Sequence, residues 1–300
     1  MMSAAEAAAR RVSGFTIIRN ATLLDFPLEA SIASLLPVVD ELIVNVGHSD
    51  DDTLNRVRGI SDPKLRIVES RWDPALGAAM LAVETQRAMA ACRHPWGIYI
   101  QADEVFADGG AKLVRDAIER YDMDTRVEGI LVDYLHFYGG FGTVARNRSW
   151  YRREVRAVRL DPGIDVHSYR DAQGFRVGAP HRRIRAVPSG AVMHHYGWAR
   201  PAWALAAKRA EDRALDPAAR QALDGRPLLP WFPGIEPFRG EHPAVAREWI
   251  AARRSSEQLI AAITFEREHL RLRALGALER ATGWRPFEFR NYVDVTGLSS

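Results

Sequence analysis

Short apolar runs alternate with helix-forming segments in the first hundred residues, and this alternation constrains the fold more than any other feature of the sequence. Runs rich in β-branched and aromatic residues stand at 15–19, 41–46, 64–68 and 96–101. Between them, residues 28–39 repeat apolar side chains at helical spacing, and residues 75–92 consist largely of strong helix formers. Strands that alternate with helices form a parallel sheet with helices on its faces. We therefore predict an α/β fold for this part of the chain.

The second half of the chain has longer strand-like runs, which are followed by helical segments. The runs stand at 127–138, 150–159, 183–187 and 191–195. Helix-forming residues dominate 202–223 and 243–281, whereas 225–243 is rich in proline and glycine. The pattern predicts three parts: a flexible N-terminus (1–13), a Rossmann-type mixed sheet flanked by helices (14–200) and a mainly helical C-terminal extension (201–300).

The composition excludes several classes of protein. Hydrophobic residues make up 47% and charged residues 26% of the chain, as in ordinary globular proteins. No run approaches the roughly 18 apolar residues that span a bilayer, and the Ala-rich start lacks an apolar signal core. The single cysteine, Cys92, excludes an internal disulfide and a thiolate metal cluster. We expect a cytoplasmic protein.

Positive charge is concentrated in one arginine-rich block. Residues 1–145 contain 14 Lys and Arg against 21 Asp and Glu, whereas residues 146–185 contain 11 Arg against 4 acids. Guanidinium groups match the oxygens of phosphates and carboxylates, although a GC-rich genome would also favour arginine. Because the block is short and no helix-turn-helix or zinc-finger spacing accompanies it, we expect no nucleic acid partner.

Acidic clusters follow two of the predicted strands. Asp50, Asp51 and Asp52 come after the second strand, and Asp103 and Glu104 come after the fourth. The carboxyl ends of parallel strands meet at one edge of a sheet, where ligands bind. The turn after the first strand has no glycine, and no P-loop is present, so dinucleotide-dependent dehydrogenases and P-loop NTPases are excluded. The clusters favour a phosphate-bearing ligand with its metal.

Four segments, in this order, resemble glycosyltransferase family 2, whose members have the GT-A fold. They are Phe15-Thr-Ile-Ile-Arg-Asn20, Asp40-Glu-Leu-Ile-Val-Asn-Val-Gly-His-Ser-Asp50, Gly97-Ile-Tyr-Ile-Gln-Ala-Asp-Glu104 and Val192-Met-His-His-Tyr-Gly-Trp198. The resemblance implies a GT-A-like domain over residues 14–200. It also implies transfer of a sugar, a hexose or a related one, from a nucleotide-diphosphate donor to an acceptor hydroxyl, with inversion at the anomeric carbon.

The resemblance further implies which residues bind the donor. It gives the nucleobase and ribose role to Asp50 and the diphosphate and metal role to Asp103, while Glu104 would orient its neighbours or the sugar. Asn45 and Gln101 depart from the family pattern, because each stands where an aspartate is usual. The implied donor-binding residues are Asn20, Asn45, Asp50, Gln101, Asp103, Glu104, Arg156 and Arg159.

The implied reaction needs a cation and a base. Mn²⁺ or Mg²⁺ would stabilise the leaving diphosphate, and Asp103 and His195 are the expected metal ligands. Asp171 is the first candidate for the general base and Glu154 the second. From the residues alone, Asp103 and Glu104 could instead cap a helix that begins near Gly110, and His195 could be a core histidine.

Partners and alternatives follow from the same resemblance. The implied acceptor is a saccharide or a lipid-linked saccharide in the biosynthesis of a cell-surface glycan. A nucleotide-sugar-binding protein that has lost turnover, through Asn45 and Gln101, and a nucleotidyltransferase are the alternatives. The arginines of the C-terminal tail, interleaved with Glu257, Glu266 and Glu268, leave open a solvated helix, a homodimer or peripheral association with the inner face of a membrane.

Overall fold

The computed structural model describes residues 11–215, 227–253, 260–261, 267–286 and 288–297. Several expectations fall outside these ranges: most of the flexible N-terminus, the end of the 202–223 helix, and Arg254, Glu257 and Glu266 of the C-terminal tail.

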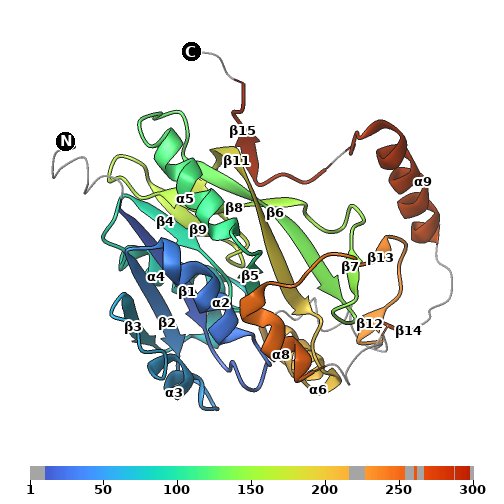
Figure 1. Ribbon diagram of the computed structural model, residues 1–300, viewed down its shortest axis with the longest axis horizontal. Helices are drawn as coiled ribbons and strands as arrows, with labels where there is room; N and C mark the ends of the chain where they lie inside the picture. The colour runs from blue at the N-terminus through green and yellow to red at the C-terminus, as the bar shows by residue number, and fades with distance from the viewer. Residues whose placement is uncertain (1–10, 216–226, 254–259, 262–266, 287, 298–300) are drawn as a thin grey trace.

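A curled, mixed sheet forms the centre of the molecule (Figure 1). Its strands in the first half are β1 (Val12–Ile18), β2 (Glu41–Gly47), β3 (Leu65–Ser70), β4 (Trp96–Tyr99) and β5 (Glu104–Phe106). Those after them are β6 (Gly129–Tyr138), β7 (Thr143–Ala145), β8 (Arg153–Arg159), β9 (Val166–Tyr169), β10 (Gly174–Val177), β11 (Arg182–Trp198), β13 (Ile235–Pro237) and β15 (Tyr292–Asp294). A separate pair joins β12 (Leu229–Pro230) to β14 (Ile260–Ala261).

The strand order places several carboxyl ends at one edge. The path through the sheet is β3-β2-β1-β4-β8-β6-β11-β10-β9. β1 pairs in parallel with β2 and β4, and β6 pairs in parallel with β11, whereas β8 runs antiparallel between β4 and β6. β1, β2, β4, β6 and β11 therefore point the same way, and the residues that follow them share one edge, which we call the carboxyl edge.

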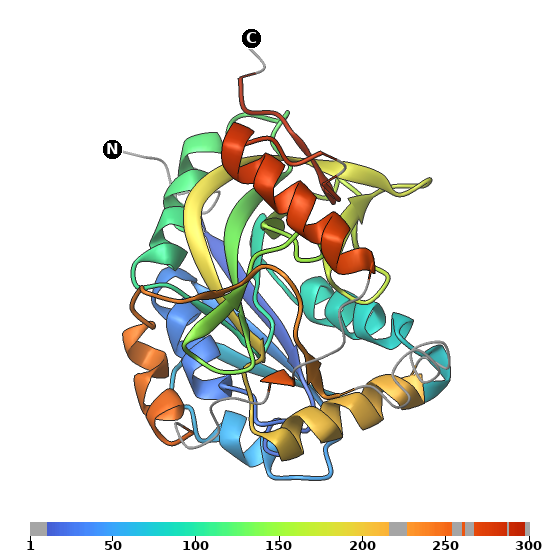
Figure 2. The same cartoon turned by 90° about the vertical axis from the view of Figure 1, so that its right-hand side faces the viewer.

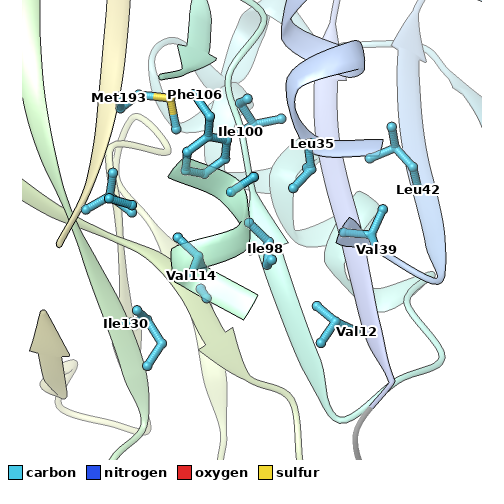
Figure 3. Close-up of a cluster of buried hydrophobic side chains, with 14 of the residues drawn as sticks. Val12, Leu35, Val39, Leu42, Ile98, Ile100, Phe106, Val114, Ile130 and Met193 are labelled. Carbon is cyan, nitrogen blue, oxygen red and sulfur yellow. The ribbon is translucent and has the colours of Figure 1, made fainter. Parts of the chain in front are cut away.

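Helices cover both faces of the sheet. They are α2 (Leu28–Leu35), α3 (Thr53–Arg58), α4 (Ala79–Ala90), α5 (Gly110–Tyr121), α6 (Ala202–Leu215), α8 (Arg247–Ala251) and α9 (Arg267–Thr282), with 3-10 turns at Leu36–Val38, Pro74–Leu76 and Ala244–Ala246. α2 and α5 pack on one face (Figure 3), where Leu42 and Val44 of β2 meet them, and Ile43 packs with α4 on the other. This arrangement confirms the predicted mixed α/β fold, which agrees with the GT-A type.

Two predicted elements differ from the structure in extent. β1 begins at Val12, three residues before the expected run. Residues 183–187 and 191–195 belong to one long strand, β11, because a register irregularity between Pro188 and Val192 absorbs the predicted break. After residue 200 the chain contributes strands as well as helices: β13 pairs with β7 and β15 pairs with β11. Among the residues described, no helix combines the length and hydropathy that a membrane span needs.

Candidate functional site

Asp103 lies in the short connection between β4 and β5 at the carboxyl edge. The backbone of this connection is held on both sides: the N–H of Gln101 donates to Glu104 (2.9 Å), and the Ser31 hydroxyl on α2 donates to the Gln101 carbonyl (3.0 Å). The Asp103 carbonyl accepts from the N–H of Tyr196 on β11 (2.8 Å). The end of β4 is thereby fixed against the end of β11, and the helix-capping alternative does not describe this residue.

Asp103 meets a histidine and an arginine. His195 Nε2 lies 3.6 Å from Asp103 Oδ2, and Arg200 Nη2 lies 2.7 Å from the same oxygen. A Cβ on Gly197 would lie 2.5 Å from His195 Nε2 and 3.0 Å from Asp103 Oδ2, so glycine is needed for this approach. The structure therefore brings together the two side chains that the sequence proposed as metal ligands. We call Asp103 and Arg200 the open pair.

His136 determines which nitrogen of His195 carries a proton. His136 Nε2 faces the Tyr151 carbonyl at 2.8 Å and must donate to it, while His136 Nδ1 lies 2.9 Å from His195 Nδ1. Burial, and then the neighbouring His195, lowers the pKa of His136 well below its ordinary value. A neutral His136 that donates through Nε2 accepts through Nδ1, so His195 Nδ1 donates. His195 therefore turns Nε2 toward Asp103, and this nitrogen carries a lone pair in the neutral imidazole and a proton in the imidazolium.

Positive charge surrounds the Asp103 carboxylate. Burial alone would raise the pKa of Asp103, but His195, Arg200 and Lys208 outweigh it and hold this pKa well below its ordinary value. Arg200 is buried, donates to the Leu24 carbonyl (2.8 Å) and lies over the Phe26 ring. Lys208 comes from α6, which crosses the carboxyl edge (Figure 2), and lies over the Trp198 ring. These cations would also attract a diphosphate.

Asp103 and His195 can together take part in binding a divalent cation. A carboxylate oxygen and the Nε2 of a neutral imidazole are donors that Mn²⁺ accepts, and the carboxylate also suits Mg²⁺. Every hydrogen bond and ion pair that the described residues make with the Asp103 side chain ends on Oδ2. Within the described ranges, no group of three or more His, Cys, Asp or Glu side chains is arranged to hold a metal ion. Asp103 and His195 thus fit as two protein ligands, with further ligands left to substrate or water.

Glu104, next to Asp103 in the sequence, is enclosed. Its carboxylate accepts from Arg156 Nη2 (2.7 Å) and Nε (3.1 Å), from the Tyr134 hydroxyl (2.6 Å) and from the Gln101 N–H. The side chains of Glu104 and Arg156 have no exposed surface. We call them the closed pair. They were expected among the donor-binding residues, but the structure places them beneath the Asp103 connection, where they support it.

The loops after β1 and β2 are tied together by Asn20. Its Oδ1 accepts from the Asp50 N–H (2.9 Å), and its Nδ2 donates to Glu211 of α6 (2.9 Å). Asp51 clamps the same loops by accepting from the N–H groups of Thr22 and Leu23 (2.8 Å each). Asp50 is left largely exposed, with its side chain 69% accessible and 3.7 Å from Arg19. The structure therefore leaves Asp50, rather than Asp51, free to meet a ligand.

A cavity of about 440 Å³ opens beside these loops, at the ends of β2 and β3. Its polar lining residues are His48, Ser49, Asp51, Asp52, Asn55, Glu69, Ser70 and Arg71. The cavity is large enough for a nucleoside, and its position on the carboxyl edge matches the place where such sheets bind ligands.

Two residues expected at the donor site lie elsewhere. Asn45 is fully buried under α4, where it donates to Glu84 (2.9 Å) and accepts from Ser70 (2.7 Å). Arg159 pairs with Trp96 at the start of β4, the end opposite to Asp103, and donates to the carbonyls of Val127 and Tyr121. Neither side chain reaches the carboxyl edge, because Asn45 points into a core and β8 runs away from that edge.

The two base candidates have different surroundings. Asp171 is exposed on a turn whose Ala172 carbonyl accepts from Gln101 Nε2 (3.3 Å), so this turn lies against the Asp103 connection. Glu154 is buried and accepts from Asn291 (2.9 Å), and burial raises its pKa. Asp171 is thus the candidate that a substrate can reach, whereas Glu154 holds the C-terminal segment.

The sequence singled out neither Arg200 nor His136 as a donor-binding, metal-binding or catalytic residue. Both depend on contacts between distant segments: Arg200 follows β11 but reaches back to Asp103, and His136 is the register partner of His195 on the neighbouring strand. The nearest sequence signal for Arg200 is its position three residues beyond the Tyr-Gly element, at Gly197.

Comparisons with known proteins give partial likenesses in structure. No family model matches the chain, and no curated protein is significantly similar to it. It is similar to S. aureus TarS 1-349 in complex with UDP, with 16% identity over 44% of this chain and 37% of that one and a TM-score of 0.33. For S. aureus TarS the sequence identity is 11%, the match covers 67% of this chain and 39% of that one, and the TM-score is 0.41. The third structure is glucosyl-3-phosphoglycerate synthase from Mycobacterium tuberculosis, solved with Mn²⁺, uridine-diphosphate and phosphoglyceric acid. Its sequence identity to this chain is 22%, the match covers 44% of this chain and 46% of that one, and the TM-score is 0.31.

The chain thus covers less than two thirds of the length of each of these three proteins. All three TM-scores lie below 0.5.

Proposed function

We propose that this protein is an inverting glycosyltransferase that moves a sugar from a nucleotide-diphosphate donor to an acceptor hydroxyl. One observation carries the proposal: at the carboxyl edge of a GT-A-like sheet, His195 Nε2 lies 3.6 Å from Asp103 Oδ2. Arg200 and Lys208 add positive charge beside them. This combination suits a diphosphate, because cations stabilise its oxygens while the carboxylate and imidazole can share a metal.

The donor would lie along the carboxyl edge. Its nucleoside would occupy the cavity at the ends of β2 and β3, and its diphosphate would lie near Asp103. The ribose would approach Asp50, whose exposed side chain lies on the same loop as the lining residues Ser49 and Asp51. Gln101 would contact the sugar or the ribose from the connection after β4. Asn20 would act indirectly, by holding the loops after β1 and β2 in place.

In the proposed reaction, the acceptor oxygen forms a bond to the anomeric carbon while the bond from that carbon to the diphosphate oxygen breaks on the opposite face. The acceptor proton passes to the Asp171 carboxylate. Arg200 and Lys208 stabilise the negative charge that grows on the diphosphate. Asp103 and His195 would hold Mn²⁺ or Mg²⁺, which when bound supplies further stabilisation of the same charge.

We also propose a class of acceptor for the sugar. A saccharide or a lipid-linked saccharide in cell-surface glycan synthesis is the class that the family resemblance suggests, with the protein in the cytoplasm or at the inner face of the membrane.

A nucleotide-sugar-binding protein without turnover is the second candidate. The observation that favours it is Arg200, which already supplies a cation to Asp103 Oδ2 at 2.7 Å. A permanent guanidinium there can hold a diphosphate without a metal, and binding would then not be followed by bond cleavage.

The experiment that separates the candidates uses the full chain with UDP-, GDP- and dTDP-hexoses, in MnCl₂ or in EDTA. We expect slow, Mn²⁺-dependent release of one nucleoside diphosphate, lost in Asp103→Asn and retained in Asp116→Asn. Asp116 is the matched control, because it is an exposed acid on α5 that pairs with Lys112 on the same helix. Binding without release, measured by calorimetry, would support the binding protein. Absence of both binding and release would overturn the two proposals together.

A further inference from the structure

A second cavity, away from the carboxyl edge, lies between α9, the segment that follows β7 and the segment around β13. Its volume is about 500 Å³. Figures 1 and 2 both show α9 on a different side of the molecule from α6, which crosses the carboxyl edge. The donor site proposed above does not use this cavity.

The cavity is strongly basic. Five arginines line it: Arg146, Arg148, Arg273, Arg280 and Arg285. Among the described lining residues, two acids, Glu236 and Glu279, stand against these five arginines, so this part of the lining has three positive charges in excess. Guanidinium groups gathered from three separate segments of the chain repel one another, and an oxyanion between them relieves that repulsion.

Arg285 is the buried member of this set. Its side chain is 2% exposed, and Nη2 donates to the carbonyls of Asn147 (2.5 Å) and Trp150 (3.1 Å). Its Nε and Nη1 have no hydrogen-bond partner, and the nearest carboxylates, on Glu279 and Glu288, lie at 3.4 and 3.6 Å. Arg285 thus fixes the backbone of this wall and adds positive charge to it, while Glu279 and Glu288 offset part of that charge.

The remaining walls are apolar and leave space for a molecular body. Trp231, Leu272 and Leu275 form part of the lining. Gly276 on α9 opens the cavity: a Cβ there would have only Arg280 Nη1 nearby, at 3.4 Å. The combination of an arginine-rich wall with an indole and leucines suits a small organic anion rather than a bare inorganic ion.

We infer that this cavity is a binding site for a small organic molecule that carries a phosphate or carboxylate group. The arginines would hold the oxyanion, and Trp231 and the leucines would contact the body of the molecule. The site also bears on the carboxyl edge. Arg285 anchors the carbonyls of Asn147 and Trp150, and the next residue, Tyr151, provides the carbonyl that orients His136. The inference does not depend on the proposed transferase function.

The test is calorimetric titration of the full chain in EDTA, without nucleotide, with glycerol 1-phosphate, malonate or neutral glycerol. We expect saturable binding of at least one anion and none of glycerol. Gly276→Leu fills the cavity and Arg280→Gln removes an exposed guanidinium group, so each variant should weaken anion binding by about tenfold or more. Arg271→Gln is the matched control, because Arg271 lies on the same helix outside the cavity lining. Leucine is a better helix former than glycine, so Gly276→Leu should not unfold α9.

Two further experiments identify the source of the anion and the place where it binds. Vesicles of phosphatidylglycerol, compared with phosphatidylcholine, test a lipid headgroup: capture that Gly276→Leu abolishes supports the same site with a lipid as the source. Lys208→Gln, which removes a cation from the carboxyl edge, should leave anion binding at this cavity unchanged. The inference is overturned if no anion binds saturably, if Gly276→Leu binds as wild type does, or if Lys208→Gln alone abolishes binding, since the anion would then occupy the donor edge.

Discussion

The acids of the open pair and the closed pair, Asp103 and Glu104, are adjacent in the sequence but differ in what their carboxylates can still bind. Glu104 accepts four hydrogen bonds and has no exposed surface, so its lone pairs are used within the protein. Contacts of the described residues with the Asp103 carboxylate use Oδ2 alone, and His195 turns Nε2 toward that oxygen. A buried acid beside an arginine is therefore not a site in itself. What distinguishes a site is the bonding capacity that remains unused.

The largest expected effect concerns the closed pair. Glu104→Gln leaves the Arg156 guanidinium buried without a counter-charge, which should lower the free energy of unfolding by about 3–5 kcal/mol. Urea unfolding at pH 7 measures this loss. The double variant Glu104→Leu with Arg156→Met removes both charges and should recover much of the stability. A single variant as stable as wild type would contradict the supporting role given to this pair.

Asp103→Asn should cost less stability than Glu104→Gln but should lose much more affinity for the donor nucleotide. Its cost in stability should be smaller, about 1–3 kcal/mol, because Asp25 and Asp212 also act electrostatically on Arg200. Its affinity for a nucleoside diphosphate with Mn²⁺, measured by calorimetry, should fall by about 100-fold or more. If the two acids lose stability and affinity in the same proportion, the distinction between the open and closed pairs is wrong.

A smaller effect tests the orientation of His195. His136→Leu removes the acceptor for His195 Nδ1–H, so Mn²⁺ affinity measured by electron paramagnetic resonance should fall by about 10–100-fold. His136→Gln offers an amide oxygen to His195 and an amide N–H to the Tyr151 carbonyl, and it should restore part of the affinity. Equal affinity in the Leu and Gln variants would show that His136 only fills space.

The smallest effect concerns Glu128, a buried acid far from the carboxyl edge. Burial would raise the pKa of Glu128, but hydrogen bonds from Arg182 and Arg185 lower it below 4.5. The folded protein thus holds this proton more weakly than the unfolded chain. The resulting stability is full above about pH 4.5 and is lost as the pH falls below it.

Glu128→Gln should therefore lower the free energy of unfolding by about 1–3 kcal/mol at pH 7, with a smaller difference from wild type at pH 3.5. Urea unfolding at the two pH values measures both differences. A difference that does not change with pH would mean that charge on Glu128 contributes nothing.

Direction and register explain which site residues could be predicted. Asp103 and His195 follow apolar runs that were recognised as strands, and strand ends share an edge in a parallel sheet. Asn45 belongs to a strand buried on both faces, where no polar side marks its orientation. Arg159 ends a strand whose sequence does not reveal that it runs antiparallel to its neighbours. Both were therefore placed at the edge by position along the chain alone.

The sequence by itself determined the mixed α/β fold, the acids that follow β2 and β4, and the histidine near the end of β11. Local periodicity and residue type carry that information. Only the tertiary structure decided that Glu104 is closed while Asp103 is open, that Arg200 and His136 belong with Asp103, and that five arginines surround one cavity beside α9. These facts depend on which face of each strand meets which distant segment, and packing of the whole chain fixes those contacts.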